Sequence, residues 1–313
     1  MDDQIIRFEN IVKKFGHHMV LNKIDLSIYD GEIFGIIGPS GSGKTTFLKT
    51  LIGYYLPEEG DVLFRPNTRF LSVYKNIKKV KQTFGYGAQQ PSFYPELTVS
   101  ENLDYFGSLY DMPSEPRKTN IKTLLKLMEL DGSANELAKN LSGGMQRRLD
   151  IACALIHAPK ILILDEPTSD LDPALAKHIW SLIRKINNKG TTIIIASHHI
   201  SDMENTCTRV GILAKGKILH VGRVQELIKK FSKGYEIHIE TYPGDYSRII
   251  KSFKEKLVIS TEDRGHEAVF YTTKPEAVLH KLLHLVGDVN ETLIDVRISK
   301  LNLDNIFLSL IQK

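Results

Sequence analysis

Long apolar runs, cysteines and a strong excess of one charge are absent or scarce in this 313-residue sequence. No stretch reaches the roughly 18 consecutive apolar residues of a transmembrane helix, and Met1-Asp2-Asp3-Gln4 does not begin a secretory signal, so we expect a chain that does not itself enter a membrane. The net charge of +4 is mild and argues against nucleic acid as a partner. The two cysteines, Cys153 and Cys207, lack metal-ligand spacing, so we expect free thiols in a reducing cytoplasm.

One glycine-rich stretch fits the phosphate-binding pattern G-x-x-x-x-G-K-[ST]: Gly38-Pro39-Ser40-Gly41-Ser42-Gly43-Lys44-Thr45. The apolar residues 33–37 before it suit a buried strand, and residues 46–52 after it suit a helix. Glycines allow backbone N–H groups to turn inward around a phosphate, and a helix N-terminus adds positive partial charge. Lys44 would then reach the β- and γ-phosphates, while the Thr45 hydroxyl ligates magnesium. A plain glycine-rich turn before a helix is the alternative.

Polar residues also follow two other predicted buried strands. The predicted strand 160–164 is followed by Asp165-Glu166-Pro167, and the predicted strand 191–196 is followed by Ser197-His198-His199. Carboxylates at the carboxyl end of a buried parallel strand are costly unless they serve a ligand. Leu141-Ser142-Gly143-Gly144 opens a helix that continues to Ile156, with Ser142 as its N-cap. Two adjacent glycines at a helix start suggest that something approaches the backbone closely.

The remaining periodicity divides the chain into further elements. Apolar residues alternate with polar ones between Ile5 and Ile28, which predicts antiparallel strands, and Phe15 in this region either packs in the core or stacks on a base. Helical periodicity covers residues 99–130, with breaks at Pro113 and Pro116. A second helical stretch covers Pro173–Asn187. A basic segment over residues 65–81 predicts a solvated loop, or a surface for anionic lipid or an acidic partner. Its basic residues are Arg65, Arg69, Lys75, Lys78, Lys79 and Lys81.

Residues 232–234 have the composition of a linker, which divides the chain into domains at 1–231 and 235–313. Beyond the linker, the predicted order is strand, helix, two strands, helix and strand, with a terminal helix from Leu303. This βαββαβ succession is the ferredoxin-like plan. It carries no catalytic constellation, so we expect a regulatory or interaction role for it.

The motifs of residues 5–225 resemble, in identity and order, those of the ATP-binding-cassette (ABC) ATPases, the nucleotide-binding subunits of ABC transporters. The resemblance rests on the phosphate loop, Gln89, the signature Leu141–Gly144, Asp165-Glu166, Ser169–Asp172 and His198. It implies an α/β P-loop NTPase cassette with a RecA-like core, an antiparallel β subdomain and a helical subdomain, followed by the small ferredoxin-like α+β domain. Met145 stands where many family signatures carry Gln, a variant found among cassettes of ABC-2-type exporters.

The resemblance also implies roles for individual residues, with ATP and Mg²⁺ as cofactors. Glu166 would act as the general base on the attacking water, and His198 would contact the γ-phosphate, with His199 a structural neighbour. A capping carboxylate is the alternative for Glu166. Asp165, Thr45 and Gln89 would hold the metal. The residues expected to bind nucleotide are Phe15 in place of the adenine-stacking aromatic, Gly38, Pro39, Ser40, Gly41, Ser42, Gly43, Lys44, Thr45, Thr46, Gln89, Ser142, Gly143, Gly144 and Asp172.

The implied partners follow from the single cassette in this chain. In this family the signature contacts the ATP that is held by a second cassette, so we expect a homodimer with two ATP molecules at its interface. The C-terminal domain resembles that of drug and sodium exporters, which favours export through a separate transmembrane permease, with the cassette bound peripherally at the cytoplasmic face of the membrane. The alternative is a soluble ABC ATPase without a membrane partner. The transported substrate does not follow from these residues.

Overall fold

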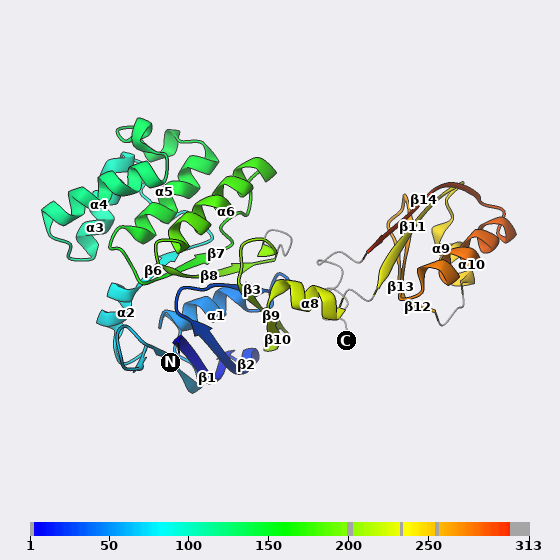
Figure 1. The fold of residues 1–313 in the computed structure, drawn as a ribbon, viewed down its shortest axis with the longest axis horizontal. Helices are drawn as coiled ribbons and strands as arrows, with labels where there is room; N and C mark the ends of the chain where they lie inside the picture. The colour runs from blue at the N-terminus through cyan, green and yellow to red at the C-terminus, as the bar shows by residue number, and fades with distance from the viewer. Residues whose placement is uncertain (1–2, 199–202, 232–233, 254–256, 301–313) are drawn as a thin grey trace. The chain divides into compact units, whose positions relative to one another are not determined.

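The structure is a computed structural model, and it describes residues 3–198, 203–231, 234–253 and 257–300. The chain divides into two compact units, residues 1–224 and 225–313 (Figure 1). No helix among the described residues combines the length and apolar character needed to cross a bilayer. Both cysteines are buried free thiols, as expected.

A six-stranded sheet forms the centre of the first unit, in the order β10-β9-β3-β8-β7-β6. The strands from β9 to β6 pair in parallel, and β10 adds an antiparallel edge. Both faces of the inner strands are covered, which explains why they appear in sequence as continuous apolar runs. The bounds are β3 Ile33–Ile37, β6 Phe84–Gly87, β7 Ile161–Asp165, β8 Thr192–Ser197, β9 Arg209–Ala214 and β10 Lys217–Gly222.

A second sheet of the first unit is antiparallel, in the order β2-β1-β4-β5. Its strands alternate buried and exposed residues over much of their length, so the prediction of antiparallel strands between Ile5 and Ile28 is confirmed. The bounds are β1 Gln4–Phe15, β2 His18–Tyr29, β4 Glu59–Phe64 and β5 Leu71–Ser72.

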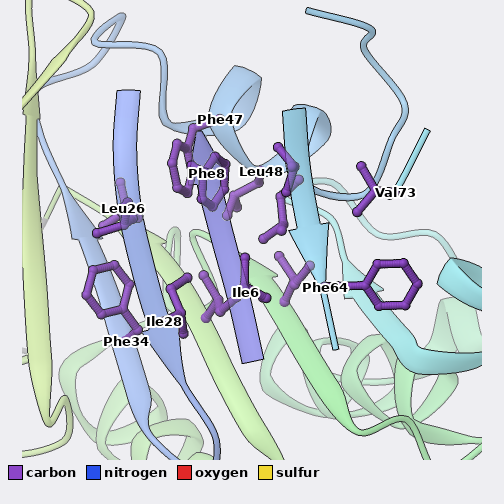
Figure 2. Close-up of a cluster of buried hydrophobic side chains, with 14 of the residues drawn as sticks. Ile6, Phe8, Leu26, Ile28, Phe34, Phe47, Leu48, Phe64 and Val73 are labelled. Carbon is purple, nitrogen blue, oxygen red and sulfur yellow. The ribbon is translucent and has the colours of Figure 1, made fainter. Parts of the chain in front are cut away.

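The core of the first unit lies between the two sheets and the helix that follows the glycine-rich loop. Phe8 of β1 stacks on Phe47 at a centroid distance of 4.3 Å, and Ile6, Ile28 and Phe34 pack in the same cluster (Figure 2). All five side chains are almost fully buried. Burial of this apolar surface anchors the helix against both sheets and so fixes the loop before it.

Helices cover the central sheet and form a cluster of their own. Helices α3, α4 and α5 pack against one another (Figure 1), and α3 begins with a capping box in which Thr98 and Glu101 bond each other's backbone N–H. The bounds are α1 Lys44–Leu51, α2 Ile77–Thr83, α3 Val99–Leu109, α4 Ser114–Leu127, α5 Gly143–Leu155 and α6 Pro173–Asn187, with 3-10 turns at Asp131–Ser133 and Ala138–Asn140.

Two predictions about local structure are wrong. Pro113 ends the first helical segment, but Pro116 does not break the second, because it lies in the first turn of α4, where backbone N–H groups have no intrahelical partner. The basic segment 65–81 is not all loop, since it contains β5 and the start of α2. Val80 and Thr83 anchor α2 by burial, whereas Lys78, Lys79 and Lys81 are exposed. Two buried positions on a short helix gave too little periodicity to reveal it.

The second unit has the predicted ferredoxin-like fold. Its sheet order is β12-β13-β11-β14, all pairs are antiparallel, and α9 and α10 pack on one face around Ile239, Phe270 and Leu282. The expected terminal helix from Leu303 lies outside the described residues. The bounds are α8 Val224–Phe231, β11 Tyr235–Tyr242, α9 Tyr246–Ser252, β12 Val258–Asp263, β13 Ala268–Thr272, α10 Pro275–Asp288 and β14 Thr292–Lys300.

We predict that His157, between α5 and β7, makes the stability of the protein pH-dependent. Its ring stacks on Tyr110 at 3.7 Å, and burial lowers its pKa to about 4. The unfolded chain, with a His pKa near 6.5, therefore binds more protons than the folded chain between these two values. The stabilisation is complete above about pH 6.5, and about 3 kcal/mol is lost as the pH falls to about 4.

Urea unfolding at several pH values measures this effect. His157→Phe keeps an aromatic ring beside Tyr110 but cannot titrate, so its loss of stability on acidification should be smaller by that amount. His178→Gln, at a side chain 43% exposed, is the control and should behave as the wild type. Equal pH dependence in all three proteins would refute the prediction.

Candidate functional site

The glycine-rich loop between β3 and α1 encloses the amino group of Lys44. The Lys44 Nζ donates to the carbonyl oxygens of Gly38, at 2.8 Å, and Pro39, at 3.3 Å. A Cβ on Gly38 would lie 2.2 Å from the Leu213 carbonyl oxygen, and Gly43 has φ 101°. Both positions therefore require glycine. The loop is held in the compact form that a phosphate-binding loop needs, with Lys44 folded back over it.

The parallel order of β3, β8 and β7 brings three more predicted residues to Lys44. Asp165 is the last residue of β7, and Glu166 follows it with φ 48°, held by its N–H bond to the Ala196 carbonyl oxygen of β8. The Glu166 carboxylate lies 3.4 Å from the Lys44 Nζ and 2.9 Å from the His198 Nδ1. Lys44 and Glu166 are buried, whereas the His198 side chain is 39% exposed. These residues therefore form one cluster at the carboxyl edge of the sheet, as expected for a ligand site of an α/β sheet.

Asp165 adds a second, almost fully buried carboxylate to this edge. Burial raises the pKa of Asp165, while a hydrogen bond with the Thr45 side chain and the charge of Lys44 lower it. The Tyr86 hydroxyl lies 3.5 Å from its Oδ2. Its Oδ1 has no hydrogen-bond partner among the described residues, nor has the buried Ser42 Oγ. A hydroxyl beside unpaired buried oxygens is a donor set that suits Mg²⁺, which prefers oxygen ligands.

The signature residues lie at the start of α5. The Ser142 Oγ accepts from the Met145 N–H at 3.4 Å, which confirms the predicted N-cap. A Cβ on Gly144 would come within 2.9 Å of the Leu175 side chain of α6, so close packing of two helices accounts for this glycine. No atom lies within 4 Å of the corresponding position on Gly143, which is exposed. The space above Gly143 is therefore open to an external group.

The other expected site residues lie outside this cluster. Phe15, at the end of β1, is 44% exposed and meets Tyr55 edge to face at 5.1 Å. Gln89 is exposed and follows β6. Asp172 is the N-cap of α6, where its Oδ1 accepts from the N–H groups of Ala174 and Leu175. Its side chain thus has a structural role in the helix start.

The residue that the sequence analysis missed is Arg147, on α5. Its buried guanidinium donates to the carbonyl oxygens of Asp165, Glu166 and Pro167 at 2.9–3.0 Å, and to that of Ala88 at 2.7 Å. The Arg147 side chain therefore connects two backbone segments: the one that carries both site carboxylates, and the one between β6 and Gln89. The signal in the sequence was an arginine on the apolar side of a predicted helix, where a buried charge needs partners.

Asp150, one turn further along α5, extends this connection. Its Oδ2 lies 3.4 Å from the Arg147 guanidinium, and its Oδ1 accepts from both the backbone N–H and the hydroxyl of Ser92. Burial raises the pKa of Asp150, and the bonds from Ser92 and the charge of Arg147 oppose that shift. Helix α5, the segment after β6 and the end of β7 are thus joined through two adjacent charged side chains.

A family model and individual relatives both identify the chain as a member of the ABC transporter family. The family model described as "ABC transporter" matches residues 21–169. Nod factor export ATP-binding protein I of Cupriavidus metallidurans is 32% identical, with 91% of each chain covered. Linearmycin resistance ATP-binding protein LnrL of Bacillus subtilis is 28% identical, with 98% of each covered. The chain also aligns over its full length with rat ATP-binding cassette sub-family A member 2 at 30% identity, although it spans only 13% of that relative.

Solved structures also resemble about three quarters of the chain. The structure of cbiO1 from Clostridium perfringens, titled as part of the ABC transporter complex cbiONQ, has a TM-score of 0.66 and 28% identity, and covers 74% of this chain and 95% of its own. The ATP-binding cassette MJ0796, solved as a dimer bound to ADP and Pi, has a TM-score of 0.62 and 30% identity, and covers 70% and 99%.

We predict that Arg147→Met strongly destabilises the protein, because the substitution removes one buried donor that serves four carbonyl oxygens, and with it the charge that faces Asp150. Removal of one partner from a buried charged pair costs about 3–5 kcal/mol. Lys118→Met removes an exposed ion pair with Glu115, 62% and 83% exposed, and should change stability by less than about 0.5 kcal/mol. Chemical denaturation of the three proteins measures both values, and similar losses for the two variants would contradict the assignment.

Proposed function

The chain belongs to the ABC transporter family and is an ATPase, and on that premise we propose that it is the ATP-hydrolysing subunit of an exporter. It powers transport by closing as a homodimer around ATP on a separate membrane subunit. The observation that carries this proposal is the cluster of Lys44, Glu166 and His198 beside the glycine-rich loop. It joins the amino group of a lysine, a carboxylate and an imidazole ring at one edge of the sheet.

Nucleotide binding uses the loop and its lysine. In the present arrangement the charge of Lys44 is balanced by Glu166 and by two loop carbonyl oxygens. A triphosphate offers stronger anionic partners to Lys44 and to the loop N–H groups, so Lys44 exchanges Glu166 for phosphate oxygens. That exchange frees the Glu166 carboxylate. Phe15, beside Tyr55, provides an exposed ring on which adenine stacks.

Thr45, Asp165 and Gln89 are the residues that would hold Mg²⁺. When bound, the ion would supply positive charge that offsets the negative charge of the nucleotide phosphates. The unpaired Asp165 Oδ1 and the nearby Thr45 hydroxyl support this assignment. Burial of Asp165 is compensated when its carboxylate faces a cation, since an unpaired buried charge is costly.

Glu166 accepts the proton of the attacking water, and His198 orients the Glu166 carboxylate. The 2.9 Å contact between the His198 Nδ1 and the Glu166 Oε2 holds the carboxylate beside the loop, and the partly exposed His198 side chain contacts the γ-phosphate when nucleotide binds. Arg147 fixes the backbone of Glu166, so the base keeps its position while its side chain changes partners.

A second copy completes the site. Ser142 and Gly143 are exposed at the start of α5, and the open space above Gly143 supports an approach by the γ-phosphate of ATP held by the partner copy. An isologous pair then encloses two ATP molecules. The relatives whose names include Nod factor export and linearmycin resistance support export as the direction of transport. We place the protein at the cytoplasmic face of the membrane, with no nucleic-acid partner.

We predict that Glu166→Gln accumulates as an ATP-bound dimer. The amide keeps the shape of the side chain but cannot accept the proton, so hydrolysis should fall by about 10²–10⁴-fold while ATP binding survives. Lys44→Ala lacks a phosphate contact needed for closure and should not form the ATP-dependent dimer. Glu129→Gln, at an exposed carboxylate on the same unit, is the control and should turn over normally.

Size-exclusion chromatography with magnesium-ATP and a phosphate-release assay separate these variants. Near-normal turnover of Glu166→Gln would mean that Glu166 is a structural carboxylate, and the proposed role as general base would be wrong.

We further predict that the segment after β6 contacts the membrane subunit. The Ser92 hydroxyl is engaged with Asp150, so the exposed Gln90 is the better probe. Because Cys153 and Cys207 are buried, Gln90→Cys provides the reactive thiol, and it should crosslink to a membrane polypeptide in the intact complex. Glu9→Cys on β1 is the control. If neither cysteine captures a membrane polypeptide while ATP hydrolysis persists in the purified protein, the alternative of an ABC ATPase without a membrane partner is favoured.

A further inference from the structure

One edge of the sheet in the second unit is long and exposed. Strand β14, Thr292–Lys300, pairs with β11 on one side and with no other strand among the described residues. It exposes two isoleucines, Ile294 at 59% and Ile298 at 46%, and its register with β11 shifts at Ile294. A nine-residue edge with exposed isoleucines is a template for pairing with another strand.

The sequence of this edge is complementary to itself. In an antiparallel pair of two copies centred on Val296, Asp295 faces Arg297 of the partner within the part of β14 that pairs regularly with β11, and Ile294, at the register shift of β14, lies opposite Ile298. By symmetry, each of these contacts forms twice. Opposed apolar residues and opposite charges are the pairs that stabilise antiparallel strands. A parallel arrangement would instead oppose like charges, and a slip by one residue would set Asp295 against Ile298, so the pattern also specifies orientation and register.

The charged side chains of β14 are placed to form these contacts. The Asp295 and Arg297 side chains are 50% and 64% exposed, and they lie 3.1 Å apart on the same strand. Arg297 also bonds Glu267 at 2.9 Å. A guanidinium has five N–H donors, so Arg297 can keep Glu267 and still bond an opposing carboxylate.

The opposite edge of the sheet lacks this property. Strand β12, Val258–Asp263, also exposes an isoleucine, Ile259, at 54%. Its sequence ends in Glu262-Asp263, so an antiparallel pair of two β12 strands opposes acidic residues to Val258 and Ile259. That pairing has no charge complement. The self-complementary pattern is therefore a property of β14 and not of exposed strands in general.

We propose that β14 pairs with β14 of a second copy and joins two sheets into one continuous eight-stranded sheet. The contact lies within the second unit and needs no nucleotide, so it goes beyond the proposed ATPase cycle and does not depend on it. A pair held at this edge remains associated after ATP leaves. Each ATPase unit then meets its partner at the high effective concentration of a tethered module.

Charge reversal in the full-length protein, without nucleotide or magnesium, tests the proposal. Arg297→Asp and Asp295→Arg each oppose like charges at both symmetric contacts, so the association constant of each variant should fall by about tenfold or more. An equal mixture of the two variants restores both attractive pairs and should form heterodimers. The double variant with the two residues exchanged should form homodimers. Analytical ultracentrifugation measures all four samples and the wild type.

Val296→Cys provides an independent test, since Val296 faces itself across the two-fold axis and opposed Cβ atoms on paired strands are about 5 Å apart. This variant should form a disulfide-linked dimer on mild oxidation, whereas Ile259→Cys on β12 should do so far less. Failure of the mixture to associate, with both variants folded by circular dichroism, would overturn the proposal. If the charge variants do not fold, equal crosslinking at positions 296 and 259 overturns it.

Discussion

The site depends on the burial of opposite charges where parallel strands end. Lys44 and Glu166 lie 3.4 Å apart with both side chains 8% exposed, and Asp165 is still more buried. Such a group of charges is stable only when each is compensated, because an unpaired buried charge costs several kcal/mol. The glycine-rich loop compensates the lysine with two carbonyl oxygens, and His198 meets the glutamate. The arrangement leaves Asp165 under-satisfied, which suits a site that gains its remaining partner from a ligand.

Arg147 extends this constraint beyond the sheet edge. A guanidinium that bonds the backbone of residues 165–167 and of Ala88 cannot move without breaking several buried hydrogen bonds. Helix α5 carries Arg147 and begins at Gly143, directly after its N-cap Ser142, which we propose faces the nucleotide of the partner copy. In that arrangement, Arg147 links Glu166, the base of one ATP site, to the helix whose N-terminal signature residues contact the other ATP. Asp150 accepts hydrogen bonds from Ser92, and so connects α5 to the segment that we propose contacts the membrane subunit.

Much of the fold followed from the sequence because the decisive signals are local. Continuous apolar runs marked β3, β7 and β8, and the order of strand, glycine-rich loop and helix identified the phosphate loop. The order of elements also predicted the ferredoxin-like unit, whose sheet order β12-β13-β11-β14 confirms it. Arg147 was missed because the carbonyl oxygens that it bonds belong to residues 18–59 positions away, and no local pattern identifies them. The short α2 was missed because only two of its residues are buried.

The self-complementary sequence of β14 also could not be interpreted without the structure. The letters of residues 294–298 were visible in the sequence, yet their pattern acquires meaning only when β14 is known to be an edge strand with β11 on its other side. The two-fold axis of an isologous contact passes through the centre of the paired segment, which for β14 is Val296. Antiparallel pairing therefore yields a closed pair and leaves no further β14 edge for growth into a filament.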